Sequence, residues 1–224
     1  MPLPWEVSRL SGTVRELHES SPAILAGACR RLVRVLEPSD RALVLGSTQP
    51  EGVVDAAACR VAGVDVVRRR SGGGAVLVDG EQLVWVDVVV PAGDPLWDHD
   101  VGRAAWWIGE TWAKALGGAL EVWKGAMLRR PHASLICFAG LGPGEVRTPR
   151  GQKVVGISQR RVQAGALFQC ACLLSWRPEE IVSLLALAEP ERGQLPSALK
   201  DVAVGAGPSC SRARLVERFL AALQ

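Results

Sequence analysis

Apolar residues recur along the chain with two different periods, and these periods predict its elements. Apolar positions three or four residues apart predict helices over 22–36, 98–116, 178–187 and 211–223. Short continuous or alternating apolar runs predict strands over 42–45, 64–67, 75–78, 83–90, 133–138, 145–148, 153–158 and 166–174. No internal repeat or low-complexity tract breaks this order. We therefore expect one α/β domain over 1–224, in which helices flank a mixed, largely antiparallel sheet.

Some of these predictions carry finer expectations. Asp79-Gly80 is a two-residue turn signal and predicts a hairpin between the strands 75–78 and 83–90. Within 83–90 the alternate valines share one face, and Asp87 falls on the other, where it is either exposed at a sheet edge or paired. The tryptophans 106 and 107 are expected to pack within the fold.

Composition and charge narrow the classes of function. With 48% hydrophobic and 22% charged residues, the chain has the composition of a soluble globular protein. A net charge of +3 is too small to indicate nucleic-acid binding, and arginines gather at 68–70, 129–130 and 160–161, which indicates local sites for anionic groups. We expect no signal peptide and no membrane-spanning run, and therefore a cytoplasmic protein. Its six cysteines are expected to be thiols rather than disulfides or zinc ligands.

Three arginines followed, after a serine, by three glycines form the first candidate site. Glycine lets a ligand lie against bare backbone N–H groups, and arginine donates to carboxylates or phosphates. The alternative is an exposed turn with a solvated charge run, but the strands on both sides would hold this loop on a rigid frame. The candidate substrate-binding residues are Arg69, Arg70, Ser71, Gly72, Gly73, Gly74 and Ala75.

A lysine and a cysteine form the second candidate site. Lys153 follows a tight turn and begins a strand, and Cys137 stands sixteen residues earlier, near the end of the strand 133–138. Taken alone, they are an exposed edge charge and a small buried thiol. If the strands bring them together, the ammonium favours the thiolate and makes Cys137 a usable nucleophile. By contrast, Cys170 and Cys172 share one strand face. We expect them to be core thiols, and the alternatives are metal binding or a redox pair.

Three stretches resemble the biotin/lipoate protein ligase superfamily, in its branch of lipoate-protein ligases and cysteine-dependent octanoyltransferases. They are Leu45-Gly46-Ser47-Thr48-Gln49, the arginine–glycine stretch 68–76, and 151–161, which is similar to the pattern Gly-x-Lys-[Val/Ile]-x-Gly-x-[Ala/Ser]-Gln-x-Arg. The resemblance implies the catalytic-domain fold of that superfamily, here without a C-terminal accessory domain. It also implies that Lys153 contacts the acyl carbonyl and that Cys137 is the nucleophile of an octanoyltransferase. Gly156, Ser158 and Gln169 join the candidate substrate-binding residues.

The chain departs from the family at two positions. Many members carry Gln-His-Gly or His-His-Gly where this chain has Gln169-Cys170-Ala171, and His-Asp where it has Val78-Asp79. Both departures remove an imidazole, and the sequence leaves their effect on substrate binding open.

Three functions fit these residues. In the first, Cys137 takes an octanoyl or lipoyl group from an acyl carrier protein and passes it to a lysine of a lipoyl domain or of the glycine-cleavage H protein, with no cofactor. In the second, the protein is a ligase that activates free lipoate with ATP and Mg²⁺ to lipoyl-AMP, with an accessory domain supplied by a separate subunit. In the third, it is a non-catalytic acyl- or nucleotide-binding module. The lack of a long C-terminal extension favours the first.

Overall fold

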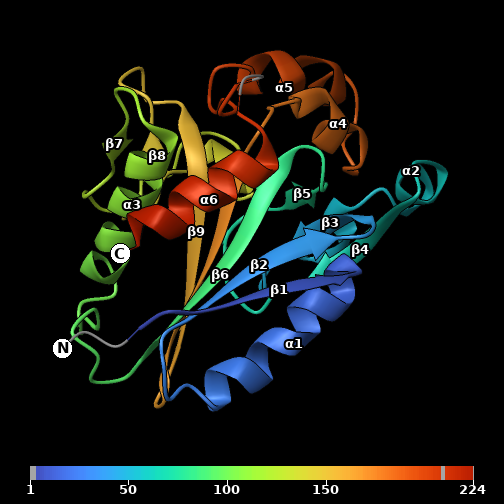
Figure 1. The fold of residues 1–224 in the computed structure, drawn as a ribbon. Helices are drawn as coiled ribbons and strands as arrows, with labels where there is room; N and C mark the ends of the chain where they lie inside the picture. Colours follow the sequence, from blue (N-terminus) through green and yellow to red (C-terminus); the bar gives the residue numbers. More distant parts are fainter. Residues whose placement is uncertain (1–3, 208–209, 224) are drawn as a thin grey trace.

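The computed structural model describes residues 4–207 and 210–223, and its main feature is a seven-stranded sheet (Figure 1). The strand order is β1 (Glu6–Gly12), β2 (Leu32–Pro38), β6 (Leu83–Pro91), β10 (Gly165–Leu173), β9 (Lys153–Val162), β8 (Val146–Arg147) and β7 (Glu121–Val122). Strands β1 and β2 run parallel, and every other neighbouring pair is antiparallel. The predicted mixed, largely antiparallel sheet is therefore confirmed.

A second, three-stranded sheet carries the glycine loop. Its order is β4 (Val64–Arg68), β3 (Arg41–Leu45) and β5 (Val76–Val78), with β3 parallel to β4 and antiparallel to β5. Because β3 and β4 are parallel, both end on the same side. The loop after β4 therefore lies next to Gly46–Gln49, which follows β3.

Each face of the large sheet is covered by helices. Val84, Val86, Val88 and Val90 pack on the side of α3 (Trp106–Leu116) and α6 (Arg212–Ala222), where Trp112 stacks 4.3 Å from Phe219. Leu83 and Trp85 pack on the side of α1 (Val14–Ala26), which crosses below the sheet in Figure 1. The predicted two-faced strand 83–90 is confirmed.

The chain is completed by short helices. The helices α4 (Pro178–Ser183) and α5 (Glu191–Leu199) lie near β5, and α2 (Ala56–Val61) follows the loop after β3 (Figure 1). Helix α4 is thus shorter than the predicted helix 178–187, and the predicted helix 211–223 is confirmed as α6. The predicted helix 98–116 begins in a 3₁₀ turn at Arg103 and becomes α-helical at Trp106.

The prediction of a helix over 22–36 is wrong. Helix α1 ends at Ala26, and 32–38 forms β2, hydrogen-bonded between β1 and β6. Val33 and Val35 point to one face of this strand, and Arg34 and Leu36 point to the other. Because both faces are buried, the strand lacks the alternation of apolar and polar residues, and its apolar run cannot be told from that of a short helix.

The predicted hairpin at Asp79-Gly80 is also wrong. Strand β5 belongs to the small sheet and β6 to the large one. The Asp79 carbonyl accepts hydrogen bonds from Gln82 N and Leu83 N, at 3.0 and 3.1 Å. The turn therefore carries the chain from one sheet to the other instead of pairing the two strands.

Candidate active site

Cys137 lies in a compact turn rather than in the predicted strand 133–138. The amides of Leu135 and Ile136 both donate to the His132 carbonyl, at 2.9 and 2.8 Å, and a 3₁₀ turn follows over Cys137–Ala139. His132 supplies a positive φ of 64°, which allows the sharp reversal. The half-buried Cys137 thus stands at the start of a turn, where its thiol is free to face the glycine loop.

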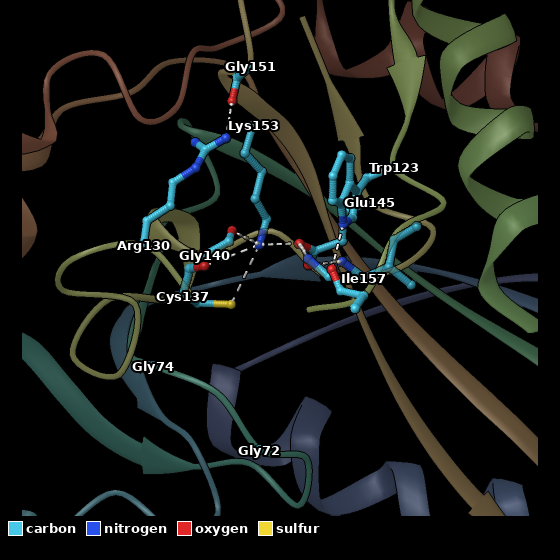
Figure 2. Close-up of polar contacts among 12 residues, drawn as sticks. Gly72, Gly74, Trp123, Arg130, Cys137, Gly140, Glu145, Gly151, Lys153 and Ile157 are labelled. Carbon is cyan, nitrogen blue, oxygen red and sulfur yellow. Dashed lines mark hydrogen bonds and ion pairs between the residues drawn. The ribbon is translucent and has the colours of Figure 1, made fainter. Parts of the chain in front are cut away.

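Lys153 brings an ammonium directly beside this thiol (Figure 2). Its side chain is 2% exposed, which rules out the explanation of an exposed edge charge. The Nζ atom donates to the carbonyl oxygens of Cys137 at 3.1 Å and Gly140 at 3.3 Å, and lies 4.0 Å from Cys137 Sγ. The predicted meeting of the two residues is confirmed.

The fixed position of this ammonium depends on Glu145, which sequence reasoning missed. Glu145 Oε2 lies 2.8 Å from Lys153 Nζ and accepts the Gly142 amide at 2.6 Å, while Oε1 accepts the Ile157 amide at 3.1 Å. Two backbone bonds and one ion pair therefore satisfy the buried carboxylate, as a buried charge requires. One signal could have revealed it, since Glu145 is the single acidic residue between Glu121 and Glu179.

The glycine loop closes over Cys137 from the other side. A Cβ on Gly73, which has φ 101°, would lie 3.9 Å from Cys137 Sγ, and a Cβ on Gly74 would lie 2.7 Å from the Cys137 amide nitrogen. The backbone of Ala75 forms hydrogen bonds with the two neighbours of Ile136. Its carbonyl oxygen accepts from the Cys137 amide at 2.9 Å, and its amide donates to the Leu135 carbonyl oxygen at 2.8 Å. Within the described ranges, the amides of Gly72, Gly73 and Gly74 donate no hydrogen bond. These donors are therefore uncommitted beside the thiol.

The arginines before the loop have different tasks. Arg69 is buried and donates to the carbonyl oxygens of Val44, Gly72 and Gly74, at 3.2, 2.7 and 2.9 Å. Arg68 donates to the carbonyl oxygens of Gly46 and Gln49. Both therefore hold the loop in shape. Arg70 is exposed and has no partner in 4–207 or 210–223, so it is the arginine of this loop that is left to meet an anion.

Beneath the loop, the large sheet presents a row of polar side chains. Ser158 on β9 bonds to Ser71 Oγ at 3.1 Å, and it is directly followed across the strands by Gln169, Asp87 and Arg34. On the same face, a Cβ on Gly156 would lie 3.2 Å from Lys153 Cε, so glycine leaves room for the lysine. Gly156, Ser158, Gln169 and Ser71 thus gather at one place, as a shared substrate site requires.

The structure decides between the two alternatives for Asp87. The carboxylate is fully buried and accepts hydrogen bonds from Trp85 Nε1 at 2.8 Å and Ser21 Oγ at 3.3 Å. Burial raises its pKa to about 6, although the charge of Arg34 acts in the opposite direction. Asp87 is therefore a partnered internal carboxylate and not an edge charge.

The two positions that depart from the family lie in the interior. Val78 is 6% exposed, and Cys170 is buried with Cys172 in the core beneath α3, on the face opposite Gln169. Burial raises the pKa of both thiols, as expected of core cysteines. A different imidazole, that of His18, has its ring centroid 4.5 Å from that of Trp85; burial lowers its pKa to about 4, and the charge of Arg69 acts in the same direction.

The rest of the described chain adds two observations. All six cysteines are free thiols. Within 4–207 and 210–223, no three His, Cys, Asp or Glu side chains group as they would around a metal ion, and no helix there has the length and apolar character to cross a membrane.

The sequence comparison agrees with this geometry. Residues 18–223 match the lipoyl protein ligase A/B catalytic domain. The chain belongs to this family. A curated relative, octanoyltransferase LipM of Clostridioides difficile (strain 630), is 28% identical over 145 residues, which is 63% of this chain and 52% of the relative. The alignment therefore spans about half the length of that protein.

Solved structures show the same lipoyl ligase catalytic fold. A bipartite lipoate protein ligase from Thermoplasma acidophilum superposes with a TM-score of 0.77 at 18% identity, over 99% of this chain and 82% of that one. A lipoate-protein ligase A structure bound with ATP gives 0.75 at 16% identity, over 100% and 84%. LipL1 of P. falciparum gives 0.70 at 12% identity, over 98% and 61%.

Proposed function

We propose that this protein is an acyltransferase that carries an octanoyl or lipoyl group on Cys137. The donor is an acyl carrier protein thioester, and the acceptor is a lysine of a lipoyl domain or of the glycine-cleavage H protein. The observation that carries the proposal is the 4.0 Å approach of Lys153 Nζ to Cys137 Sγ, with Gly73 on the other side of the sulfur. The likeness to an octanoyltransferase supports the same reaction.

The first half-reaction loads the cysteine. The Cys137 sulfur attacks the carbonyl carbon of the donor thioester, and the bond between carbon and donor sulfur breaks. The carrier sulfur leaves as a thiol, with the proton that the Cys137 thiol gives up. Negative charge develops on the carbonyl oxygen during the attack. We expect the positive charge of the Lys153 ammonium and the uncommitted amides of Gly73 and Gly74, which lie beside Cys137, to stabilise it, because fixed charges and donors in a preorganised site need no reorganisation.

The second half-reaction unloads it. The neutral amine of the acceptor lysine attacks the Cys137 thioester, the bond between carbon and Cys137 sulfur breaks, and an amide forms. The amine loses one proton in this step and the sulfur regains it. The same oxyanion donors serve both halves, so the transfer requires no cofactor.

One feature of the loop weighs against the ligase alternative, in which ATP and Mg²⁺ would form lipoyl-AMP. Arg68 and Arg69 are occupied by backbone carbonyl oxygens, which leaves Arg70 as the free cation of the loop for phosphate in the described structure. A non-catalytic binding module would have no use for a nucleophile beside a fixed ammonium.

Intact mass spectrometry tests the proposal. The protein and its Cys137→Ala variant are incubated with octanoyl-loaded acyl carrier protein, without ATP. We expect an octanoyl adduct on the wild type and none on the variant, with Cys170→Ala as the matched control that still loads. Absence of the adduct, together with lipoyl-AMP once ATP, Mg²⁺ and lipoate are added, would establish the ligase. If neither the adduct nor lipoyl-AMP forms, the result would favour the non-catalytic binding module.

A further inference from the structure

Charge is distributed unevenly along this chain. Residues 122–178 hold nine Lys or Arg and one Asp or Glu, whereas the rest of the chain holds seventeen basic and twenty-two acidic residues. The single acid of this stretch, Glu145, is buried and paired with Lys153. The segment that supplies Cys137 and Lys153 therefore presents positive charge alone to its surroundings.

Some of these cations are balanced and others are not. Arg147 pairs with Glu121 at 2.9 Å, and Lys124 pairs with Glu110 at 2.7 Å. Arg129 and Arg150 are exposed and have no ion pair or hydrogen bond to any part of the chain that the structure describes. Charge left unpaired on a surface is available for a partner.

The two unpaired arginines lie close to the catalytic pair. Arg130 donates to the Gly151 carbonyl at 2.9 Å, and this bond ties the segment that carries Arg129 to the turn that carries Arg150. Figure 2 shows Arg130 and Gly151 beside Lys153, on the side away from Gly72 and Gly74. The two segments that carry the unpaired cations thus meet beside Lys153, on the side away from the glycine loop.

Two exposed apolar side chains adjoin these arginines. Met127 is 57% exposed and Leu128 is 38% exposed. Leu128 exchanges backbone hydrogen bonds with Leu141 at 2.8 and 3.1 Å, next to Gly140, whose carbonyl oxygen accepts from Lys153. Apolar residues flanked by charge are the arrangement of a protein–protein interface.

We propose that Met127, Leu128, Arg129 and Arg150 form a basic rim on which the acceptor domain docks, and that this domain carries acidic residues around its target lysine. The inference rests on the proposed function, because an acceptor domain whose lysine has to reach the half-buried Cys137 must lie against surface near the catalytic pair. Opposite charges would speed the encounter and orient the lysine. The rim lies outside the acyl site, so it acts on the acceptor and not on loading.

The test separates binding, loading and transfer in one set of variants. The double variant Arg129→Glu/Arg150→Glu is compared with Arg60→Glu/Arg214→Glu, which changes the net charge equally at exposed arginines of α2 and α6. Affinity for an apo lipoyl domain is measured by titration calorimetry. Loading is followed by intact mass with two donors, octanoyl-N-acetylcysteamine and octanoyl-loaded acyl carrier protein, and transfer is followed from preloaded enzyme to the domain.

We expect the rim variant to bind the domain about tenfold more weakly or worse and to lose transfer in proportion, with loading unchanged. The wild-type advantage should shrink as salt is raised. Equal binding by wild type and rim variant, or an equal loss in the control variant, would overturn the proposal. So would a loss confined to loading from acyl carrier protein, which would assign the rim to the donor. Because binding is measured without turnover, failure to load would refute the proposed function, and the calorimetry would still decide the docking surface.

Discussion

The ion pair between Glu145 and Lys153 yields a prediction that can be worked from the structure. Their side chains are 7% and 2% exposed, and the two charged atoms are 2.8 Å apart. Glu145→Gln leaves a buried ammonium without its counterion, and Lys153→Met leaves a buried carboxylate. Removing one partner of such a pair costs about 3–5 kcal/mol, much of it from the charge left behind.

The double variant Glu145→Gln/Lys153→Met removes both charges. It keeps one oxygen for the amides of Gly142 and Ile157, so one backbone donor loses its acceptor at a cost of ~1–3 kcal/mol. We therefore expect the double variant to lose less free energy of unfolding than the two single variants lose together. The difference should be at least about 2 kcal/mol. Urea unfolding at neutral pH, followed by tryptophan fluorescence, measures the three free energies of unfolding.

Additive losses, within about 0.5 kcal/mol, would refute the reasoning, because they would mean that the two charges are separately solvated. The same variants also report on function. Glu145→Gln retains the ammonium but frees it to move, so we expect loading of Cys137 to slow by about tenfold or more, with the affinity for the donor much less affected.

Two further predictions concern the loop and the α1 side of the sheet. A Cβ on Gly46 would lie 1.9 Å from the Gly73 carbonyl oxygen, so Gly46→Ala should displace the loop and slow loading by about 100-fold. Gly52→Ala meets nothing within 4 Å and is the control; equal rates for both would contradict a tight loop. Burial lowers the pKa of His18 from 6.5 to about 4, so the unfolded chain binds more protons in that window and stability falls as the pH falls through it. The free energy of unfolding, measured with urea, should therefore fall by ~2 kcal/mol less between pH 7 and pH 5 in His18→Phe than in the wild type. An equal fall in both proteins would show that the pKa of His18 is not lowered by folding.

Some features of this fold follow from the local pattern of residues. The β-branched run 83–90 has to be a strand, and its alternation separates the valine face from the face of Trp85 and Asp87. The stretch of arginines and glycines, and the resemblance that adds Cys137 and Lys153 to it, marked the candidate site. The sequence raised the approach of Cys137 to Lys153 as one of two interpretations, and the distance of 4.0 Å between Lys153 Nζ and Cys137 Sγ decides it.

Other features depend on contacts between segments that are distant in the sequence. The apolar pattern of residues 32–36 is compatible with a helix or with a buried strand. The segment forms a strand because β1 and β6, on either side of it, supply partners for its backbone hydrogen bonds. Asp79 joins two sheets because β3 and not β6 pairs with β5. Likewise, Glu145 becomes the counterion of Lys153 only when folding buries both charges at the same place. Arg69 holds its own loop because its buried guanidinium needs acceptors and the loop carbonyl oxygens provide them.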